Sequence, residues 1–344
     1  MVLSKTIILI YSLSTIMLLN SCSDNPINDV VNNGPGRRDY IWEEDTLKLP
    51  SGYGLSIGRN WGSSPNNIWL IGAASSVKHG IWHYDGESWK TDSIFRPVYP
   101  GAIYGFSRDN VWIGNNWDGS TWHYNGVDWS KFSDIDIPGY RPFVYAGMWG
   151  SAPNNIYAVG LADRLDLQDY KGVITHFNGS NWELVNIPDI PTVFIGILYE
   201  KESGKYLIAS VSHGDIVKPY RLYVFDGQQL TEIFSSNNEG ITVYEMNGNA
   251  YVIIGRKIYK YANNNLRLWK DFTGTQFVVG IFGRNEEDFF TLNWDGIGHY
   301  NGTDLKTIYP SDLLLRSATI FSNEVFFYSQ DENNSNIIIR GTLK

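Results

Sequence analysis

The sequence predicts an all-β fold, a β-propeller of seven four-stranded blades, chiefly because a four-residue phrase recurs along it. The phrase reads His, Tyr or Phe, Asp or Asn, then Gly, and a large apolar residue follows three positions later. Successive copies end 40, 53, 48, 36 and 39 residues apart. A period near 40, with short apolar runs and no helical periodicity, is typical of propeller blades. The clear copies are residues 83–86, 123–126, 176–179 and 299–302, and the weaker ones are residues 224–227 and 260–263.

The first repeat shows how one blade is expected to form. Pro65 with its neighbouring Asn residues favours a turn over residues 62–67, between the first two strands. Asp85-Gly86 favours a tight hairpin turn between the last two. Residues 149–160 nearly duplicate residues 61–72, so the same pattern returns later in the chain. The four expected strands, named a to d from the inner to the outer edge, are residues 54–60, 68–72, 80–84 and 88–94.

The two ends of the repeat region are expected to meet in one blade. The last repeat offers only three strands, at residues 318–321, 324–329 and 336–342, and an unassigned strand precedes the first repeat at residues 41–50. We expect this N-terminal strand to complete the final blade, because closing the ring removes exposed sheet edges. This count gives seven blades. Six or eight remain alternatives, since the repeats are weakest over residues 192–275.

The first 21 residues have the composition of a signal peptide. Lys5 is their only charged residue, and the apolar run that follows is short for a membrane span. The run ends in Leu19-Asn20-Ser21-Cys22, which resembles a bacterial lipobox. The resemblance implies that residues 1–21 are removed, that Cys22 is lipidated, and that the protein lies in the bacterial cell envelope, anchored to the outer membrane. Residues 22–39 are then a flexible tether and residues 40–344 the propeller domain.

Composition limits the classes of partner. The chain carries 27 basic and 36 acidic side chains, a net charge of −9. An acidic surface disfavours nucleic acid and anionic lipid as partners. Cys22 is the only cysteine, so an intramolecular disulfide is impossible. We expect a monomer that contacts the membrane only through its N-terminal lipid.

The repeated histidines and aromatic residues are interpreted as structural. Each histidine of the phrase occupies the same place in a different blade, so the four should be too far apart to share a metal ion. We expect no metal site and no cofactor. The repeated aromatic residues are expected to pack between neighbouring blades, where such side chains bury large areas. They are Trp69, Trp112, Tyr157 and Tyr251 in strand b, and Trp89, Trp129 and Trp182 in strand d.

Any specific site should lie in the connections that do not repeat. By analogy with other propellers, ligands bind on the face formed by the b–c and d–a connections. Insertions in a regular repeat are common places for function, although such loops can also be simple solvated connections. The candidate ligand-binding residues on this face are Trp117, Trp294, Asp163, Arg164, Asp215, His213, Tyr140 and Arg141.

The repeat pattern resembles secreted propeller lipoproteins of Bacteroidetes-like bacteria, with blades of the form WGSSPNNIW…HYDGxxW. The resemblance spans most of the chain and implies the fold but little about activity. We favour a module that binds a glycan or a protein, because no nucleophile motif, metal-ligand cluster or phosphate loop is present. The alternative is a carbohydrate-active enzyme, a polysaccharide lyase or glycoside hydrolase. It would need carboxylates, or an Arg cluster with a Tyr and an acid, converging on the b–c/d–a face.

Overall fold

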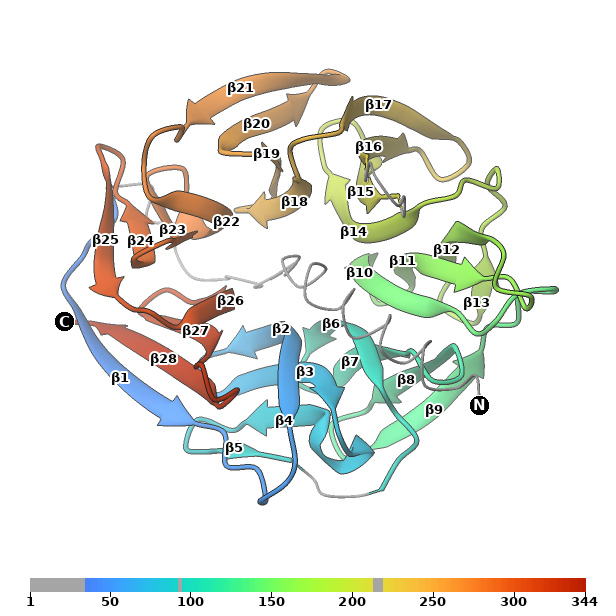
Figure 1. Ribbon diagram of the computed structural model, residues 1–344, viewed down its shortest axis with the longest axis horizontal. Helices are drawn as coiled ribbons and strands as arrows, with labels where there is room; N and C mark the ends of the chain where they lie inside the picture. The colour runs from blue at the N-terminus through green and yellow to red at the C-terminus, as the bar shows by residue number, and fades with distance from the viewer. Residues whose placement is uncertain (1–34, 92–94, 213–218) are drawn as a thin grey trace.

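The protein is a ring of seven antiparallel four-stranded sheets, seen down its central axis in Figure 1. The structure is a computed structural model that describes residues 35–91, 95–212 and 219–344. The predicted seven-bladed propeller is confirmed, and residues 192–275, where the repeats are weakest, form two regular blades. Within the described residues the one helical element is the 3-10 turn η1 (Val77–His79), and no helix is long and apolar enough to cross a membrane.

Each of the first six blades is built from four consecutive strands, ordered a to d from the axis outward. Blade 1 contains β2 (Leu55–Ser64), β3 (Asn67–Ala74), β4 (Ile81–Tyr84) and β5 (Trp89–Lys90). Blade 2 contains β6 (Pro100–Ser107), β7 (Asn110–Asn115), β8 (Ser120–Tyr124) and β9 (Trp129–Asp134). Blade 3 contains β10 (Val144–Ala152), β11 (Asn155–Asp163), β12 (Tyr170–Phe177) and β13 (Trp182–Leu184).

The remaining blades follow the same order, except that the last takes its outer strand from the start of the chain. Blade 4 contains β14 (Val193–Glu200), β15 (Lys205–Val211), β16 (Tyr220–Phe225) and β17 (Leu230–Ser236). Blade 5 contains β18 (Ile241–Met246), β19 (Asn249–Ile254), β20 (Lys257–Ala262) and β21 (Asn265–Asp271). Blade 6 contains β22 (Phe277–Asn285), β23 (Asp288–Asn293), β24 (Gly296–Tyr300) and β25 (Leu305–Pro310). Blade 7 contains β26 (Leu314–Ile320), β27 (Glu324–Gln330), β28 (Asn336–Leu343) and β1 (Tyr40–Thr46).

The N-terminal strand β1 closes the ring, as expected. It pairs antiparallel with β28 over its whole length, from Tyr40 opposite Leu343 to Thr46 opposite Ile337. The Trp42 ring packs against Phe327 of the same blade at 6.4 Å and against Tyr309 of blade 6 at 5.1 Å, measured between ring centroids. The strand therefore joins the two ends of the chain and also seals the boundary between two blades.

The a–b turns are shorter than the sequence suggests. In blade 1 the inner strand continues to Ser64, so the turn consists only of Pro65 and Asn66 rather than residues 62–67. A register shift between Gly62 and Ser64 accommodates an extra residue and lets pairing continue past it.

The core lies between neighbouring blades and is rich in aromatic side chains. Trp69 of blade 1 contacts Tyr124 and Trp129 of blade 2, at 4.8 and 5.3 Å between ring centroids. Trp112 of blade 2 contacts Phe177 of blade 3 in the same way, at 4.7 Å. The interpretation of these repeated residues as inter-blade packing is correct.

The phrase histidines are internal hydrogen-bonding groups. In blade 1, His83 Nε2 lies 2.8 Å from Asn67 Oδ1, and the His83 ring stacks on Trp69 with 4.2 Å between centroids. The partner is a side chain at the start of strand b, which agrees with the structural role expected for the histidine. The pairs in the other blades are His123 with Asn110 at 3.0 Å, His176 with Asn155 at 2.7 Å, and His299 with Asp288 at 2.9 Å.

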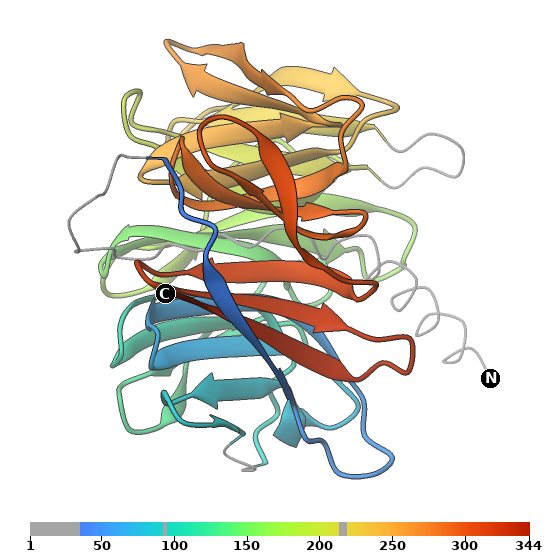
Figure 2. The ribbon, with the colours of Figure 1, turned by 90° about the vertical axis from the view of Figure 1, so that its left-hand side faces the viewer.

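The two faces of the ring carry different connections. The b–c and d–a connections form one face, and the a–b and c–d turns form the other, as the side view in Figure 2 allows the reader to follow. Gly36 lies on the a–b/c–d face, where its N–H donates to Glu287 O at 2.8 Å. Nearby, Arg38 donates to Asp304 Oδ1 at 2.7 Å and to His299 O at 2.8 Å. Gly36 and Arg38, at the end of the predicted tether, therefore contact blade 6.

Candidate ligand-binding face

Exposed apolar side chains gather on the b–c/d–a face. Thirteen large apolar residues in the described ranges are exposed, and eight of them lie on these connections or at the strand end beside them. Ile41 and Val127 lie toward the opposite face, and three others lie on outer strands. This one-sided distribution makes the b–c/d–a face the place where an interaction surface is expected. The eight are Tyr53, Phe95, Tyr99, Trp117, Leu165, Leu167, Trp294 and Leu314.

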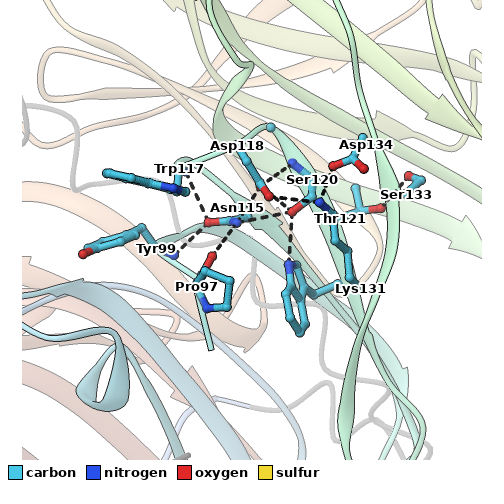
Figure 3. Close-up of polar contacts among 12 residues, drawn as sticks. Pro97, Tyr99, Asn115, Trp117, Asp118, Ser120, Thr121, Lys131, Ser133 and Asp134 are labelled. Atoms are coloured by element: carbon cyan, nitrogen blue, oxygen red, sulfur yellow. Dashed lines mark hydrogen bonds and ion pairs between the residues drawn. The ribbon is translucent and has the colours of Figure 1, made fainter. Parts of the chain in front are cut away.

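An exposed aromatic pair marks this face on blade 2. Trp117 lies in the b–c turn and Tyr99 in the d–a connection that precedes the blade. Their ring centroids are 5.4 Å apart with an interplanar angle of 31°, and the side chains are visible in Figure 3. Trp117 is 66% exposed and Tyr99 is 37% exposed, so both rings remain open to a ligand.

A buried amide holds the two aromatic residues in place. Asn115 is fully buried at the end of β7. Its Oδ1 accepts hydrogen bonds from the Tyr99 N–H at 2.8 Å and the Trp117 N–H at 3.2 Å (Figure 3). Its Nδ2 donates to Pro97 O at 2.9 Å and to Asp118 Oδ1 at 2.7 Å. One side chain therefore fixes both connections that carry the exposed rings.

Asp118 completes this network below the turn. Its Oδ1 accepts from the Ser120 N–H at 3.0 Å and from the Ser120 hydroxyl at 2.5 Å, and its Oδ2 lies 3.1 Å from Lys131 Nζ. Burial raises the pKa of Asp118, but the Ser120 hydrogen bonds and the Lys131 ammonium outweigh it, so the pKa lies below its ordinary value. The carboxylate is thus ionised and committed to the turn.

On blade 3 the structure brings together four of the residues that the sequence singled out. The d–a connection carries Tyr140 and Arg141, and the b–c loop carries Asp163 and Arg164. Tyr140 and Arg164 form an isolated antiparallel bridge, and the Arg141 N–H donates to Asp163 O at 2.7 Å. The Leu165 N–H adds a second backbone bond between the two loops, to Gly139 O of the d–a connection, at 3.2 Å. The two loops behave as one hydrogen-bonded unit.

Blades 2 and 3 are joined directly beneath these loops. The Tyr145 N–H of β10 donates to Asn116 Oδ1 at 2.7 Å, and the Tyr145 hydroxyl donates to Gly119 O at 2.9 Å. The aromatic pair and the blade 3 loops therefore lie on contiguous elements. We call this surface the blade 2–3 strip, and it consists of Tyr99, Trp117, Tyr140, Arg141, Arg164, Leu165 and Leu167.

Other predicted residues lie elsewhere. Trp294 is 69% exposed on the b–c turn of blade 6, which is three blades from blade 2 by the shorter way around the ring. It can belong to the same face but not to the same small site. His213, Asp215 and Cys22 fall outside the described residues.

The cationic side chains on the strip and beside it differ in whether a carboxylate pairs with them. Arg164 Nη2 lies 3.1 Å from Asp166 Oδ2. Lys171 Nζ, at the start of β12, lies 2.7 Å from Asp189 Oδ1 and 4.4 Å from the centre of the Tyr140 ring. Within the ranges the structure describes, the guanidinium of Arg141 has no hydrogen-bond or ion-pair partner.

Cavities formed by the described residues include three that lie away from the strip. Their volumes are about 140 to 270 Å³, and residues outside the strip line them. Across residues 35–91, 95–212 and 219–344, no group of three or more His, Cys, Asp or Glu could hold a metal ion.

Sequence reasoning missed the residues that support the strip. Asn115 directly precedes the singled-out Trp117 turn, and an amide at the end of an apolar strand is the signal that could have indicated its role. Leu165 and Leu167 carry no distinctive signal in the sequence, because single apolar residues are common in charged loops.

Solved structures show what the fold resembles. Scans of family models and of curated proteins give no match to this chain. A structure described as YCF48 bound to D1 peptide is 14% identical with a TM-score of 0.58, over 92% of this chain and 99% of that one. A streptogramin B lyase is 13% identical with a TM-score of 0.59, over 87% and 97%. YCF48 from Cyanidioschyzon merolae is 13% identical with a TM-score of 0.59, over 88% and 98%. At these identities the likeness shows the propeller fold alone.

Proposed function

We propose that this protein is a binding module that holds an extended segment of another protein on the blade 2–3 strip. The observation that carries this proposal is the one-sided clustering of exposed apolar side chains on the b–c/d–a face. Exposed aromatic side chains lower the solubility of a protein unless a partner covers them.

The side chains of the strip suit a protein better than a sugar. Trp, Tyr and Arg dominate the energetics of protein interfaces, and Trp117, Tyr140 and Arg141 supply all three types. Aromatic rings alone would also stack on a sugar, but the exposed Leu165 and Leu167 offer a sugar no hydrogen bonds. The peptide in the YCF48 structure supports a peptide ligand for this architecture by analogy only.

A fixed backbone makes the strip a good binding surface. Asn115 and the paired blade 3 loops hold the exposed side chains before any ligand arrives. Pre-ordered groups lose less conformational entropy on binding, so more of the contact energy remains as affinity.

We also propose that the module works outside the cytoplasm, held to a bacterial membrane by lipid on Cys22. The lipobox-like sequence before Cys22 supports this proposal. Two or more acyl chains are needed for stable anchoring, since each buried methylene contributes about 0.8 kcal/mol.

Selection of peptides from a random library tests the proposed ligand. The full chain is immobilised in detergent and panned with a phage library of random linear peptides, and a glycan array is probed in parallel. We expect enriched peptides whose affinity falls about tenfold or more in Trp117→Ala. Leu268→Ala is the matched control, because Leu268 is exposed on outer strand β21. Glycan binding without peptide enrichment, or peptide binding that survives Trp117→Ala, would overturn the proposal.

A further inference from the structure

We infer that the bound segment presents a carboxylate to Arg141 beside an apolar side chain that contacts Leu165 and Leu167. This inference rests on the proposed function and names the chemistry of its ligand: an acidic residue close to an aliphatic or aromatic one. The surroundings of Arg141 and the geometry of the blade 3 loop carry it independently.

The backbone of Arg141 is fixed while its side chain is not. The Tyr140 N–H donates to Ile137 O at 2.9 Å, and the Arg141 N–H donates to Asp163 O at 2.7 Å. Pro142 follows and restricts the chain further. The guanidinium thus extends from a defined point on the strip with its N–H donors unused by the described residues.

Arg141 differs from the cationic side chains around it because it has no carboxylate partner among the described residues. The chain has 36 acidic and 27 basic residues, so carboxylates are abundant. Arg164 and Lys171, which lie nearby, each have a carboxylate partner, and so does Lys131 below the aromatic pair. Arg141 alone among these cations is left for an external anion, and guanidinium binds carboxylate with paired, directional hydrogen bonds.

The leucines are held in a rigid turn. The Arg164 N–H donates to Asp169 O at 2.8 Å, and the Leu167 N–H donates back to Arg164 O at 2.9 Å. The Gln168 N–H donates to Asp166 Oδ1 at 3.1 Å. Leu165 is 64% exposed and Leu167 45% exposed at the outside of this turn.

Leu167 occupies a conformation that its side chain does not favour. Its φ is 58°, in the left-handed region where Gly or Asn is usual. A leucine there costs roughly 1 to 2 kcal/mol, and local strain of this kind tends to accompany binding sites. The turn therefore presents the exposed apolar surface of Leu167 to the ligand from a fixed position.

The experiment compares acidic peptides with their amide counterparts. Peptides selected on the full chain are sequenced, and one with Asp or Glu is also made with Asn or Gln at that position. We expect enrichment of acidic residues next to apolar ones. Arg141→Gln should weaken the acidic peptide about tenfold and leave the amide peptide almost unchanged. Raising the salt concentration should weaken the binding of the acidic peptide to the wild-type protein. It should leave the binding of the amide peptide almost unchanged.

Arg267→Gln is the charge-matched control, since Arg267 is exposed on β21, far from blade 3. Leu167→Gly tests the second contact: it relieves the strained φ, so it should keep or raise stability while it lowers peptide affinity. Peptides that need Trp117 but bind Arg141→Gln equally well would overturn this inference and leave the proposed function standing. A lack of any Trp117-dependent peptide would overturn both.

Discussion

Arg38 Nη1 lies 2.7 Å from Asp304 Oδ1, and this contact joins the segment before β1 to blade 6. The other terminal nitrogen of Arg38 donates to the carbonyl oxygens of His299 and Asp304, at 2.8 and 2.6 Å. Its Nε also donates to His299 Nδ1 at 3.3 Å, so one side chain satisfies four acceptors on blade 6. The segment before β1 is part of the propeller's packing.

Replacing Arg38 should destabilise the domain. Arg38→Ala removes the half-buried hydrogen bonds to blade 6, and we expect a loss of about 1 to 3 kcal/mol in the free energy of unfolding. Arg37→Ala is the control, because the Arg37–Asp39 ion pair is exposed to solvent and should contribute little to stability. Urea denaturation measures both, and equal effects would contradict the role assigned to Arg38.

Closure by β1 is tested with Trp42. Trp42→Ala removes contacts with both Tyr309 and Phe327, so we expect a loss of about 2 to 4 kcal/mol and a lower melting temperature. Ile41→Ala, at an exposed position of the same strand, should change stability by less than about 1 kcal/mol. Deleting residues 39–50 should have the largest effect, and a melting temperature unaltered by that deletion would refute closure.

The phrase histidines should make the fold sensitive to mild acid. Burial, with a smaller contribution from Arg108, lowers the pKa of His83 to about 4, whereas an unfolded histidine titrates near 6.5. Between these values the unfolded chain binds the proton and the folded one does not. Stability is therefore complete above pH 6.5 and falls as the pH decreases toward 4.

His83→Gln should reduce this pH dependence. Because the His83 side chain is partly exposed, we expect the wild-type protein to lose only about 1 kcal/mol more than the variant between about pH 7 and pH 5. Both proteins share every carboxylate, so the difference in unfolding free energy isolates the imidazole. Parallel curves for the two proteins would contradict the assignment.

Substitutions of Asn115 and Trp117 should distinguish a residue that supports the strip from one that contacts the ligand. Asn115→Ala leaves several buried groups unpaired, so we expect about 2 to 4 kcal/mol lower stability and weaker peptide binding. Trp117→Ala removes an exposed ring, and its stability should stay within about 0.5 kcal/mol of the wild type while binding is lost. Thermal melts and binding titrations on both variants decide the matter, and a marked loss of stability in Trp117→Ala would make that ring structural.

Membrane attachment depends on Cys22 in our proposal. Cys22→Ala should move the protein from the membrane fraction to the soluble fraction after cell lysis and centrifugation. Cys22→Ser offers a near-isosteric second variant that cannot carry the thioether-linked lipid. Persistent membrane association of both variants would rule out the lipid anchor.

The fold could be predicted from the sequence because each blade repeats the same local signals. The Asp85-Gly86 turn and the aromatic residues of strands b and d fix strand order and packing, and the missing fourth strand of the last repeat indicated the closure by β1. The partner of His83 was not predictable, since the Asn67 side chain reaches it only through the register of strands b and c.

The site was predicted only in outline. Tyr140, Arg141, Asp163 and Arg164 come from two connections far apart in sequence, and nothing in either connection encodes the bridge between them. Trp294 looks equivalent to Trp117 in sequence but lies across the ring, because a repeated motif is placed once per blade rather than once per site.

The position of Gly36 determines which face of the propeller lies next to the N-terminal segment. Gly36 leaves the propeller beside Glu287 on the a–b/c–d face, and the blade 2–3 strip is on the opposite side. About 14 residues separate Gly36 from Cys22, a reach of at most about 50 Å when extended. If Cys22 carries a lipid as proposed, the tether would meet the domain on the face opposite the blade 2–3 strip, so attachment would not cover the strip. The blade 2–3 strip would then remain accessible to a partner protein that approaches from the surrounding medium.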